Sequence, residues 1–388
     1  MHENELLFAL LRAEVCGVPA DGQIIQTLSP QLMEKLYILA VRHDLAHIAT
    51  QALSKLGLLK EDAISQKFKD KAMQAMRRYV LMTHAYGQIC KVLEEAAIPF
   101  IPLKGAVLRE AYPQPWMRTS CDVDILVREE HLDRAVCALT QQLGYCNKGR
   151  SDHDVLLSSG NGVYLELHYD TIQERYAANG CRDILAEVWQ NAKPKENGSF
   201  HYCMSDAMFY FYHVAHMAKH FEVGGCGVRS FLDLWIMNHA MVHDRKARET
   251  YLQEGGLLKF AQAAEKLSEA WFSGEKMDAM TGQVSDYILR AGVYGDEANR
   301  AALGQARMGG RLRYVLLRRV FMPYDYLKAE YPVLEKHRWL MPVYQVVRWL
   351  RVLWGKDVRR RVAELKTNAA VSESQTASAA ALLKYLGL

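Results

Sequence analysis

Two aspartates stand one residue apart within an apolar run, RTSCDVDILV, at residues 118–127. Side chains alternate between the faces of a β-strand, so Asp122 and Asp124 would point the same way while Val123 and Ile125 point into the core. Neighbouring carboxylates repel each other, and burial makes their charges less favourable. The pair therefore predicts a divalent cation beside it, and oxygen ligands suit Mg²⁺ or Mn²⁺. The alternative is a D-x-D motif on a solvated edge of the sheet.

A third carboxylate lies in the run VYLELHYD, residues 163–170. Alternation in a strand would place Tyr164, Glu166 and His168 on one face. If this strand pairs close to the first, Glu166 joins the two aspartates. The arrangement then predicts a metal site with three carboxylates.

The segment PLKGAVLREAY, residues 102–112, is typical of a strand, a glycine turn and a helix. Backbone N–H groups at a helix N-terminus attract anions, and Lys104 beside Gly105 adds a positive charge. The segment therefore predicts a phosphate-binding site near the carboxylates.

Three histidines, His213, His216 and His220, stand in HVAHMAKH at spacings that place them within about 60° of one another on a helix. Three interpretations stay open: a zinc site, the lining of a polar cleft, and ordinary structural histidines. A phosphohydrolase built on this helix is disfavoured, because the run has no adjacent His-Asp pair. Arg229 and Asp233 predict an intrahelical ion pair, with the alternative that the preceding GGCG brings Arg229 to a phosphate.

The elements that must position these residues change in character along the chain. Residues 1–95 have apolar residues three and four apart, which predicts an N-terminal helical region. Residues 96–182 alternate strand and helix patterns, and residues 183–388 predict an all-helical C-terminal domain. Within that domain the low-complexity run NAAVSESQTASAAA predicts a flexible segment at 367–380.

The central region, 96–182, predicts a small mixed sheet with helices on one side. AIPFIPLKG and DVDILV predict strands, and AVLREAY and EEHLDRAVCALTQQLG predict helices. DHDVLLSS and VYLELHYD predict a hairpin that turns at Gly160-Asn161-Gly162. The predicted fold class is α+β, with helical regions on both sides of the core.

The composition is that of a folded chain: 388 residues, half of them apolar, with a net charge of +4. This charge is no strong signature of nucleic-acid binding. No apolar run is long enough for a membrane span, and the first residues lack the basic start of a secretion signal, so we expect a cytoplasmic protein. The eight cysteines lack zinc-ligand spacing, and we expect them to be reduced, buried and structural.

Tryptophans and arginines mix in RWLMPVYQVVRWLRVLWGKDVRRRVAELK, residues 338–366. We expect a helix that packs its tryptophans on the helical domain, and the alternative is contact with a membrane surface. Pro342 and Gly355 interrupt the run and argue against one long helix on a membrane.

The order of these features resembles the nucleotidyltransferase superfamily that includes DNA polymerase beta and the aminoglycoside nucleotidyltransferases. IPFIPLKGAVLREAYPQPWMRTSCDVDILV, followed by LELH, HVAHMAKH and GVRSFLDLW, resembles the bacterial family called uncharacterised nucleotidyltransferases. The resemblance spans most of the chain and is strongest from Ile98 to Asp233. It implies transfer of a nucleoside monophosphate from a nucleoside triphosphate, such as ATP, to an acceptor hydroxyl with release of pyrophosphate.

The resemblance also implies roles for individual residues. Asp122 and Asp124 would bind Mg²⁺ or Mn²⁺, two ions in all, and Glu166 would complete the metal site and help to activate the acceptor. The nucleotide would contact Lys104, Gly105, Arg118 and Ser120. The acceptor, which the sequence does not identify, would lie between the sheet and the C-terminal helices, facing His168, His213, His216 and Arg229.

One departure concerns the turn that would cradle the triphosphate. The serine that usually follows the glycine is Ala106 here, and sixteen residues separate Gly105 from Asp122. Lys104 would then take the place of the missing hydroxyl. The departure keeps open a second hypothesis, a non-catalytic nucleotide-binding or regulatory protein on the same fold, although the three carboxylates favour the enzyme.

Overall fold

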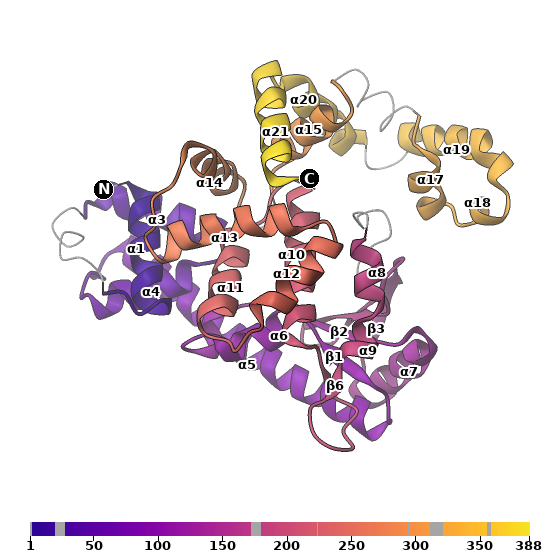
Figure 1. Ribbon diagram of the computed structural model, residues 1–388, viewed down its shortest axis with the longest axis horizontal. Coiled ribbons are helices and arrows are strands. Elements are labelled where there is room, and N and C mark those ends of the chain that lie inside the picture. Colours follow the sequence, from indigo (N-terminus) through magenta and orange to yellow (C-terminus); the bar gives the residue numbers. More distant parts are fainter. Residues whose placement is uncertain are drawn as a thin grey trace.

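The computed structural model describes residues 2–19, 28–171, 180–222, 224–292, 295–310, 321–354 and 358–388. Figure 1 shows a small sheet at the lower right, the N-terminal helices at the left and the C-terminal helices at the top. The α+β fold class is confirmed.

Five strands form the main sheet, in the spatial order β1-β2-β5-β4-β3. They are β1 (Phe100–Pro102), β2 (Asp122–Val127), β3 (Cys146–Arg150), β4 (Asp154–Ser158) and β5 (Tyr164–His168). β2 and β5 run parallel, and the other three neighbouring pairs are antiparallel. The sheet is therefore mixed, and its parallel pair joins the two strands that carry the carboxylates.

One face of the sheet packs against two helices, α5 (Ala63–Glu95) and α7 (Leu132–Leu143). Alternate residues of β2 and β5 point to this face, and each is at most 3% exposed: Val123, Ile125, Leu165 and Leu167. The alternation predicted for DVDILV is confirmed. The carboxylates of the same strands are left on the opposite face.

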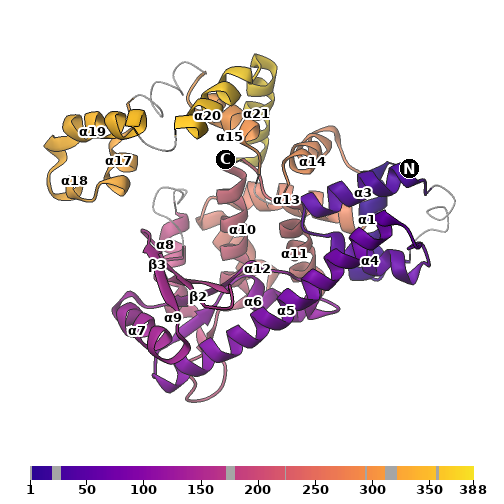
Figure 2. The ribbon, with the colours of Figure 1, turned by 180° about the vertical axis from the view of Figure 1, so that it is seen from behind.

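The long helix α5 connects the N-terminal helices to the sheet (Figure 2). The side chain of Asp62 accepts a hydrogen bond from the Ser65 N–H and so caps the first turn. Its 33 residues span about 50 Å. Phe68, near the start, packs with the N-terminal helices, whereas Ile89 and Leu93, near the end, pack under the sheet.

The N-terminal helices share one hydrophobic core with helices that follow the sheet. The N-terminal set is α1 (Glu3–Val15), α3 (Pro30–Arg42) and α4 (Ala46–Lys55). The later set is α8 (Cys181–Ala186), α9 (Val188–Asn191), α10 (Asp206–Glu222), α11 (Val228–His239), α12 (Arg245–Glu254), α13 (Leu258–Phe272) and α14 (Ala279–Ala291). Phe8 stacks on Trp271 with ring centroids 4.8 Å apart. Helices far apart in the sequence, α1 and α13, are thus in direct contact.

A smaller cluster is formed by α15 (Glu297–Arg307), α21 (Glu373–Leu386) and Val371, and α20 (Val358–Ala370) packs on α15 beside it. Nearly all of segment 367–380, which the sequence predicts to be flexible, lies in α20 and α21. The Ser372 side chain accepts from the Gln375 N–H, and the Gln375 side chain accepts from the Ser372 N–H. The alanines that make this run low in complexity also favour helix.

Three helices stand apart from the rest in both views: α17 (Tyr324–Glu330), α18 (Val333–Lys336) and α19 (Met341–Trp354). Trp339 is 75% exposed, so the expectation that the tryptophans of this segment pack on the helical domain is wrong there. In the neighbouring α19, Gln345 and Arg348 are buried, whereas Val343, Val346 and Val347 are exposed. Gly355 lies outside the described residues. Among the described helices, none combines the length and apolar character needed to cross a membrane.

Two short strands lie in the region that was predicted to be all-helical. β6 (Lys193–Pro194) and β7 (Tyr202–Cys203) pair with each other. Strands of two residues are too short to show a period in sequence. The edge strand β3 was also not predicted, because all five of its residues are exposed and the run CNKGR shows no apolar alternation.

All eight cysteines are free thiols. The prediction that all are buried is wrong, since four are exposed: Cys121, Cys137, Cys146 and Cys203. Cys146 lies in the exposed edge strand β3, and Cys137 lies on the outer side of α7. An apolar neighbourhood in sequence does not decide which side of an element a cysteine occupies.

Candidate active site

The predicted carboxylates meet where β2 and β5 pair. In this parallel register Asp124 stands opposite Glu166, and Asp122 stands opposite Tyr164. Alternation puts these residues on the face opposite the apolar core. The Asp124 side chain is 5% exposed and that of Glu166 is 31% exposed. The structure thus brings the three carboxylates to one face, with Asp124 deeply buried.

Asp124 has two close partners. Lys104 Nζ lies 2.7 Å from Asp124 Oδ1, and His168 Nε2 donates a hydrogen bond to the same oxygen at 3.1 Å. His168 Nε2 also lies 3.4 Å from Glu166 Oε2. Burial opposes ionisation of Asp124, but Lys104 and His168 outweigh burial and hold its pKa below the ordinary value. Asp124 is therefore an anion at neutral pH.

The pKa of Asp122 shifts in the opposite direction to that of Asp124. Burial, with the added charges of Asp124 and Glu166, raises the pKa of Asp122 to about 6. Lys104 opposes this rise without cancelling it. Ligand atoms of Asp124, Glu166 and His168 lie within 4.8 Å of one another. Asp122, two residues before Asp124 on the same face of β2, adds a further carboxylate next to this group. The face carries more negative charge than its lysine neutralises, and a bound cation would relieve that excess.

The segment after β1, predicted to be a glycine turn followed by a helix that binds phosphate, forms only a very short helix. α6 (Gly105–Leu108) has only four residues, and its macrodipole is correspondingly small. The N–H groups of Ala106 and Val107 already donate to the carbonyl oxygens of Leu103 and Lys104. Lys104 has a φ of 44°, a conformation that costs a non-glycine residue about 1–3 kcal/mol. The turn therefore presents the Lys104 ammonium group rather than a row of helix N–H groups.

Gly105 and Ser120 face each other beside this turn. A Cβ atom added to Gly105 would lie 3.3 Å from the Cβ of Ser120, so a side chain there would have to move Ser120. The Ser120 hydroxyl in turn accepts a hydrogen bond from Arg109 Nη2 at 3.1 Å. The close approach accounts for glycine at position 105.

Asp233 holds a buried network that the sequence did not indicate. Arg118 Nε donates to both Asp233 carboxylate oxygens, at 2.7 and 3.0 Å, and the Tyr112 hydroxyl donates to Oδ1 at 2.7 Å. All three side chains are buried. The predicted intrahelical pair of Arg229 with Asp233 is wrong, because Asp233 turns to Arg118 instead.

Arg229 reaches in a different direction. Its Nη1 lies 2.8 Å from Asp44 Oδ2, between α3 and α4, and donates to the Thr119 carbonyl oxygen at 3.2 Å. α11 is therefore tied to the loop before β2 and to the N-terminal helices. Arg118 and Arg229 both form hydrogen bonds to other parts of the chain, and these bonds hold the walls of the site in place.

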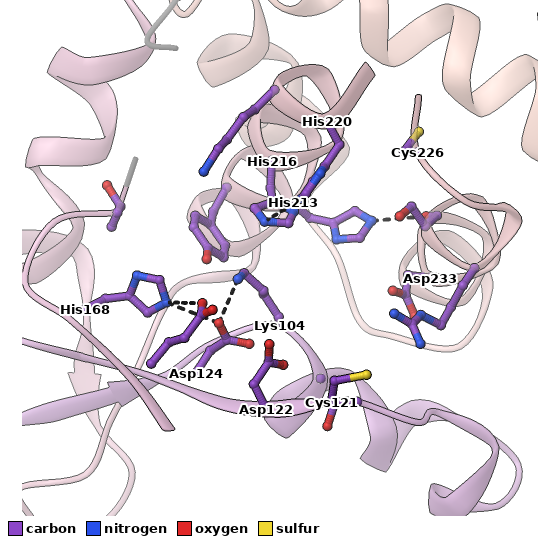
Figure 3. A pocket seen from close by; sticks show the side chains of 18 of the residues that line it. Lys104, Cys121, Asp122, Asp124, His168, His213, His216, His220, Cys226 and Asp233 are labelled. Carbon is purple, nitrogen blue, oxygen red and sulfur yellow. Dashed lines mark hydrogen bonds and ion pairs between the residues drawn. The ribbon is translucent and has the colours of Figure 1, made fainter. Parts of the chain in front are cut away.

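A cavity of about 380 Å³ lies between this face of the sheet and α10 and α11 (Figure 3). That volume is within the usual range for a small-molecule pocket. All of the predicted site residues line it: Lys104, Gly105, Arg118, Ser120, Asp122, Asp124, Glu166, His168, His213, His216 and Arg229. The chemistry that the sequence predicted in separate segments is thus brought to one cavity.

The histidines of α10 lie across the cavity from Asp122 and Asp124 (Figure 3). His213 Nε2 donates to the Ser230 carbonyl oxygen at 3.1 Å, and His216 and His220 share a hydrogen bond between their Nε2 atoms at 3.2 Å. Burial, with Lys104 nearby, keeps the pKa of His216 well below its ordinary value. Among the described residues these three histidines form no three-ligand group, so the structure supports the cleft-lining interpretation over the zinc site.

Sequence reasoning missed several residues of the cavity. His153, Asp154, Tyr212 and Lys219 also line it. A signal for two of them was present in DHDVLLSS, because hairpin pairing places Asp154 opposite His168. Tyr212 is hidden in the run of aromatic residues that also form the core of α10.

The sequence matches the family described as uncharacterised nucleotidyltransferase over residues 29–273. This range contains every residue that lines the cavity. No curated protein and no solved structure matches the chain.

Proposed function

The chain belongs to the uncharacterised nucleotidyltransferase family, and from this membership we propose that it is a metal-dependent nucleotidyltransferase. It transfers a nucleoside monophosphate from a nucleoside triphosphate to an acceptor hydroxyl and releases pyrophosphate. The observation that carries the proposal is the register of β2 and β5, which sets Asp124 beside Glu166 with Asp122 on the same face.

The donors of this face fit Mg²⁺ or Mn²⁺. Carboxylate oxygens are the ligands that these cations prefer, and the raised pKa of Asp122 indicates negative charge that is not neutralised. Asp122, Asp124 and Glu166 would hold one or two ions. Such ions, when bound, polarise the α-phosphate and neutralise charge on the leaving pyrophosphate.

The side chains of the protein supply the remaining functions. Glu166, partly exposed to the cavity, accepts the proton of the acceptor hydroxyl as that oxygen attacks the α-phosphorus in line. Lys104 stabilises charge on the phosphate oxygens. His168 donates to Asp124 and lies against Glu166, so it orients both carboxylates.

The acceptor binds between the sheet and α10, facing His213 and His216. Burial lowers the pKa of both imidazoles, so they offer hydrogen bonds without adding positive charge. Arg118 and Arg229 are held by Asp233 and Asp44, and we assign them to positioning the walls of the cavity. His213→Ala with His216→Ala should therefore weaken use of the acceptor more than binding of metal and nucleotide.

The direct test is a screen of nucleoside triphosphates with Mg²⁺ or Mn²⁺ that measures pyrophosphate release across pools of hydroxyl acceptors. We expect release with at least one acceptor pool, and none from the Asp122→Ala/Asp124→Ala double variant. Absence of release from the wild-type protein in every combination would overturn the proposal.

One feature favours a second candidate, a non-catalytic nucleotide-binding protein. Lys104 already occupies one oxygen of Asp124, and Ala106 follows the glycine of the turn. In that case Mg²⁺ with a nucleoside triphosphate would raise the melting temperature of the wild-type protein but not of the double variant, and no pyrophosphate would appear.

A further inference from the structure

A second group of potential metal ligands lies on the side of His168 away from β2. His153, Asp154 and His168 each offer a ligand atom, and these atoms lie within 4.8 Å of one another. Hairpin pairing creates the group, because Asp154 at the start of β4 stands directly opposite His168 at the end of β5. His153 and His168 have ring centroids 5.6 Å apart.

His168 has one ring nitrogen without a partner. Its Nε2 atom is engaged by Asp124 on β2 and by Glu166 on the same strand, β5. Its Nδ1 atom is buried and makes no hydrogen bond, although the residue is only 4% exposed. A buried polar atom without a partner is unfavourable by about 1–3 kcal/mol, so an unsatisfied imidazole nitrogen in this position calls for a ligand.

The other two residues are already oriented by neighbours. The Ser151 hydroxyl donates to Asp154 Oδ1 at 2.9 Å and lies 2.7 Å from His153 Nδ1. Asp152 Oδ1 lies 3.2 Å from the same His153 nitrogen. These contacts leave His153 Nε2 facing Asp154 Oδ2 at 3.1 Å. Ligand histidines in metal sites are held in this way, through the ring nitrogen that does not bind the metal.

We propose that His153, Asp154 and His168 bind a divalent transition-metal ion, for which Zn²⁺ is the natural probe. Two imidazoles and one carboxylate suit zinc, and three protein ligands leave one coordination position open. Tetrahedral ligands of zinc lie about 3.3 Å apart, so small side-chain movements would close this group around an ion. The site lies beside the carboxylate face in the same cavity, and it would use the nitrogen of the shared His168 that Asp124 and Glu166 leave free.

The proposed zinc site and the carboxylate face share one imidazole, that of His168. An ion on Nδ1 of His168 fixes the tautomer that carries its proton on Nε2, which is the proton donated to Asp124. The hard-oxygen face of Asp122, Asp124 and Glu166 would retain its preference for Mg²⁺ or Mn²⁺. The proposal does not depend on nucleotidyl transfer, because zinc binding is measured without substrate.

The experiment uses the full chain, freed of metal by a chelator that is then removed, and titrates it with Zn²⁺ against a chromophoric competitor. We expect one tightly bound equivalent. His153→Gln and Asp154→Asn should each weaken binding at least 10-fold, because each removes one of three ligands. Ser151→Ala, which removes only an orienting contact, should weaken it about 10-fold. Circular dichroism establishes that each variant is folded.

Two controls separate this site from other ligands. His84→Gln changes an exposed histidine of α5 and should leave zinc affinity unchanged. Asp122→Asn changes the carboxylate face and should also leave it unchanged. Co²⁺ in place of Zn²⁺ should give the visible absorption of a tetrahedral site, lost in His153→Gln. Absence of binding by the wild-type protein, equal binding by His153→Gln and Asp154→Asn, or loss in Asp122→Asn would each overturn the proposal.

Discussion

The two faces of the main sheet are built from the same strands but differ in what holds them. On the face covered by α5 and α7, side chains such as Ile125 and Leu167 pack only in an apolar core. On the cavity face, the neighbouring residues Asp124 and Glu166 meet charged and polar groups. Strand alternation alone produces this division. The apolar face supplies stability, and the cavity face places charges where the proposed reaction would need them.

The cavity face depends on partners that are distant in sequence. Lys104 and Asp124 are 20 residues apart, Arg118 and Asp233 are 115 apart, and Arg229 and Asp44 are 185 apart. The apolar face needs no such specific charged partners, because a hydrophobic side chain of suitable size and shape stabilises it by packing. The difference leads to distinct expectations for substitutions on the two faces.

The largest expected effect is on turnover and comes from the cavity face. Asp124→Asn removes a proposed metal ligand, which would be worth several kcal/mol in the transition state, so pyrophosphate release should fall about 1,000-fold or more. Asp133→Asn, an exposed aspartate on α7 at the other side of the sheet, is the matched control and should keep wild-type turnover. Equal activity of the two variants would remove Asp124 from the catalytic site.

The next effect is on stability and tests the network behind the cavity. Asp233→Ala leaves Arg118 buried without its partner, which should lower the free energy of unfolding by about 3–5 kcal/mol in a denaturant titration. Lys266→Ala breaks the exposed pair with Asp278 and should change the unfolding midpoint much less. Similar midpoints for the two variants would show that the buried pair does not stabilise the site.

Shortening a side chain on the apolar face should lower the stability of the protein rather than its activity. Leu167→Ala, at a fully buried position, should lower the free energy of unfolding by about 2–5 kcal/mol. Leu156→Ala makes the same change on the cavity face, where Leu156 is only partly buried opposite Glu166, and should be less destabilising. Equal losses in urea unfolding would contradict the division between the faces.

The smallest expected effect reports the burial of Asp122 and its repulsion by Asp124 and Glu166 on the cavity face. The folded-state pKa of Asp122 is raised to about 6, so its charge reduces stability above that pH, and the penalty disappears as pH falls toward its unfolded value near 4. In metal-free protein, Asp122→Asn should therefore raise the free energy of unfolding by about 2–3 kcal/mol at pH 8, and by less than about 1 kcal/mol at pH 4. A gain that is the same at both pH values would argue against this source.

Local sequence determined much of the core. The alternation in DVDILV and VYLELHYD was enough to assign which residues face the core and which face the site, because it depends only on strand geometry. Gly160 to Gly162 correctly marked the hairpin turn between β4 and β5. The long helix α5 lies in the region whose apolar spacing predicted helix, and the structure adds its cap at Asp62. Each of these features is set by residues within a few positions of one another.

Other features were decided only by tertiary structure. The spacing of Arg229 and Asp233 favours a pair within α11, yet each found a better-placed partner in the fold, Asp44 and Arg118. The group of His153, Asp154 and His168 exists only because the hairpin register joins the ends of two strands. A charged group selects its partner by distance, burial and hydrogen-bond geometry, which depend on how distant segments pack. The sequence by itself therefore determined which chemical groups the site contains, whereas the packing of α10, α11 and the N-terminal helices decided which of them are paired and which face the cavity.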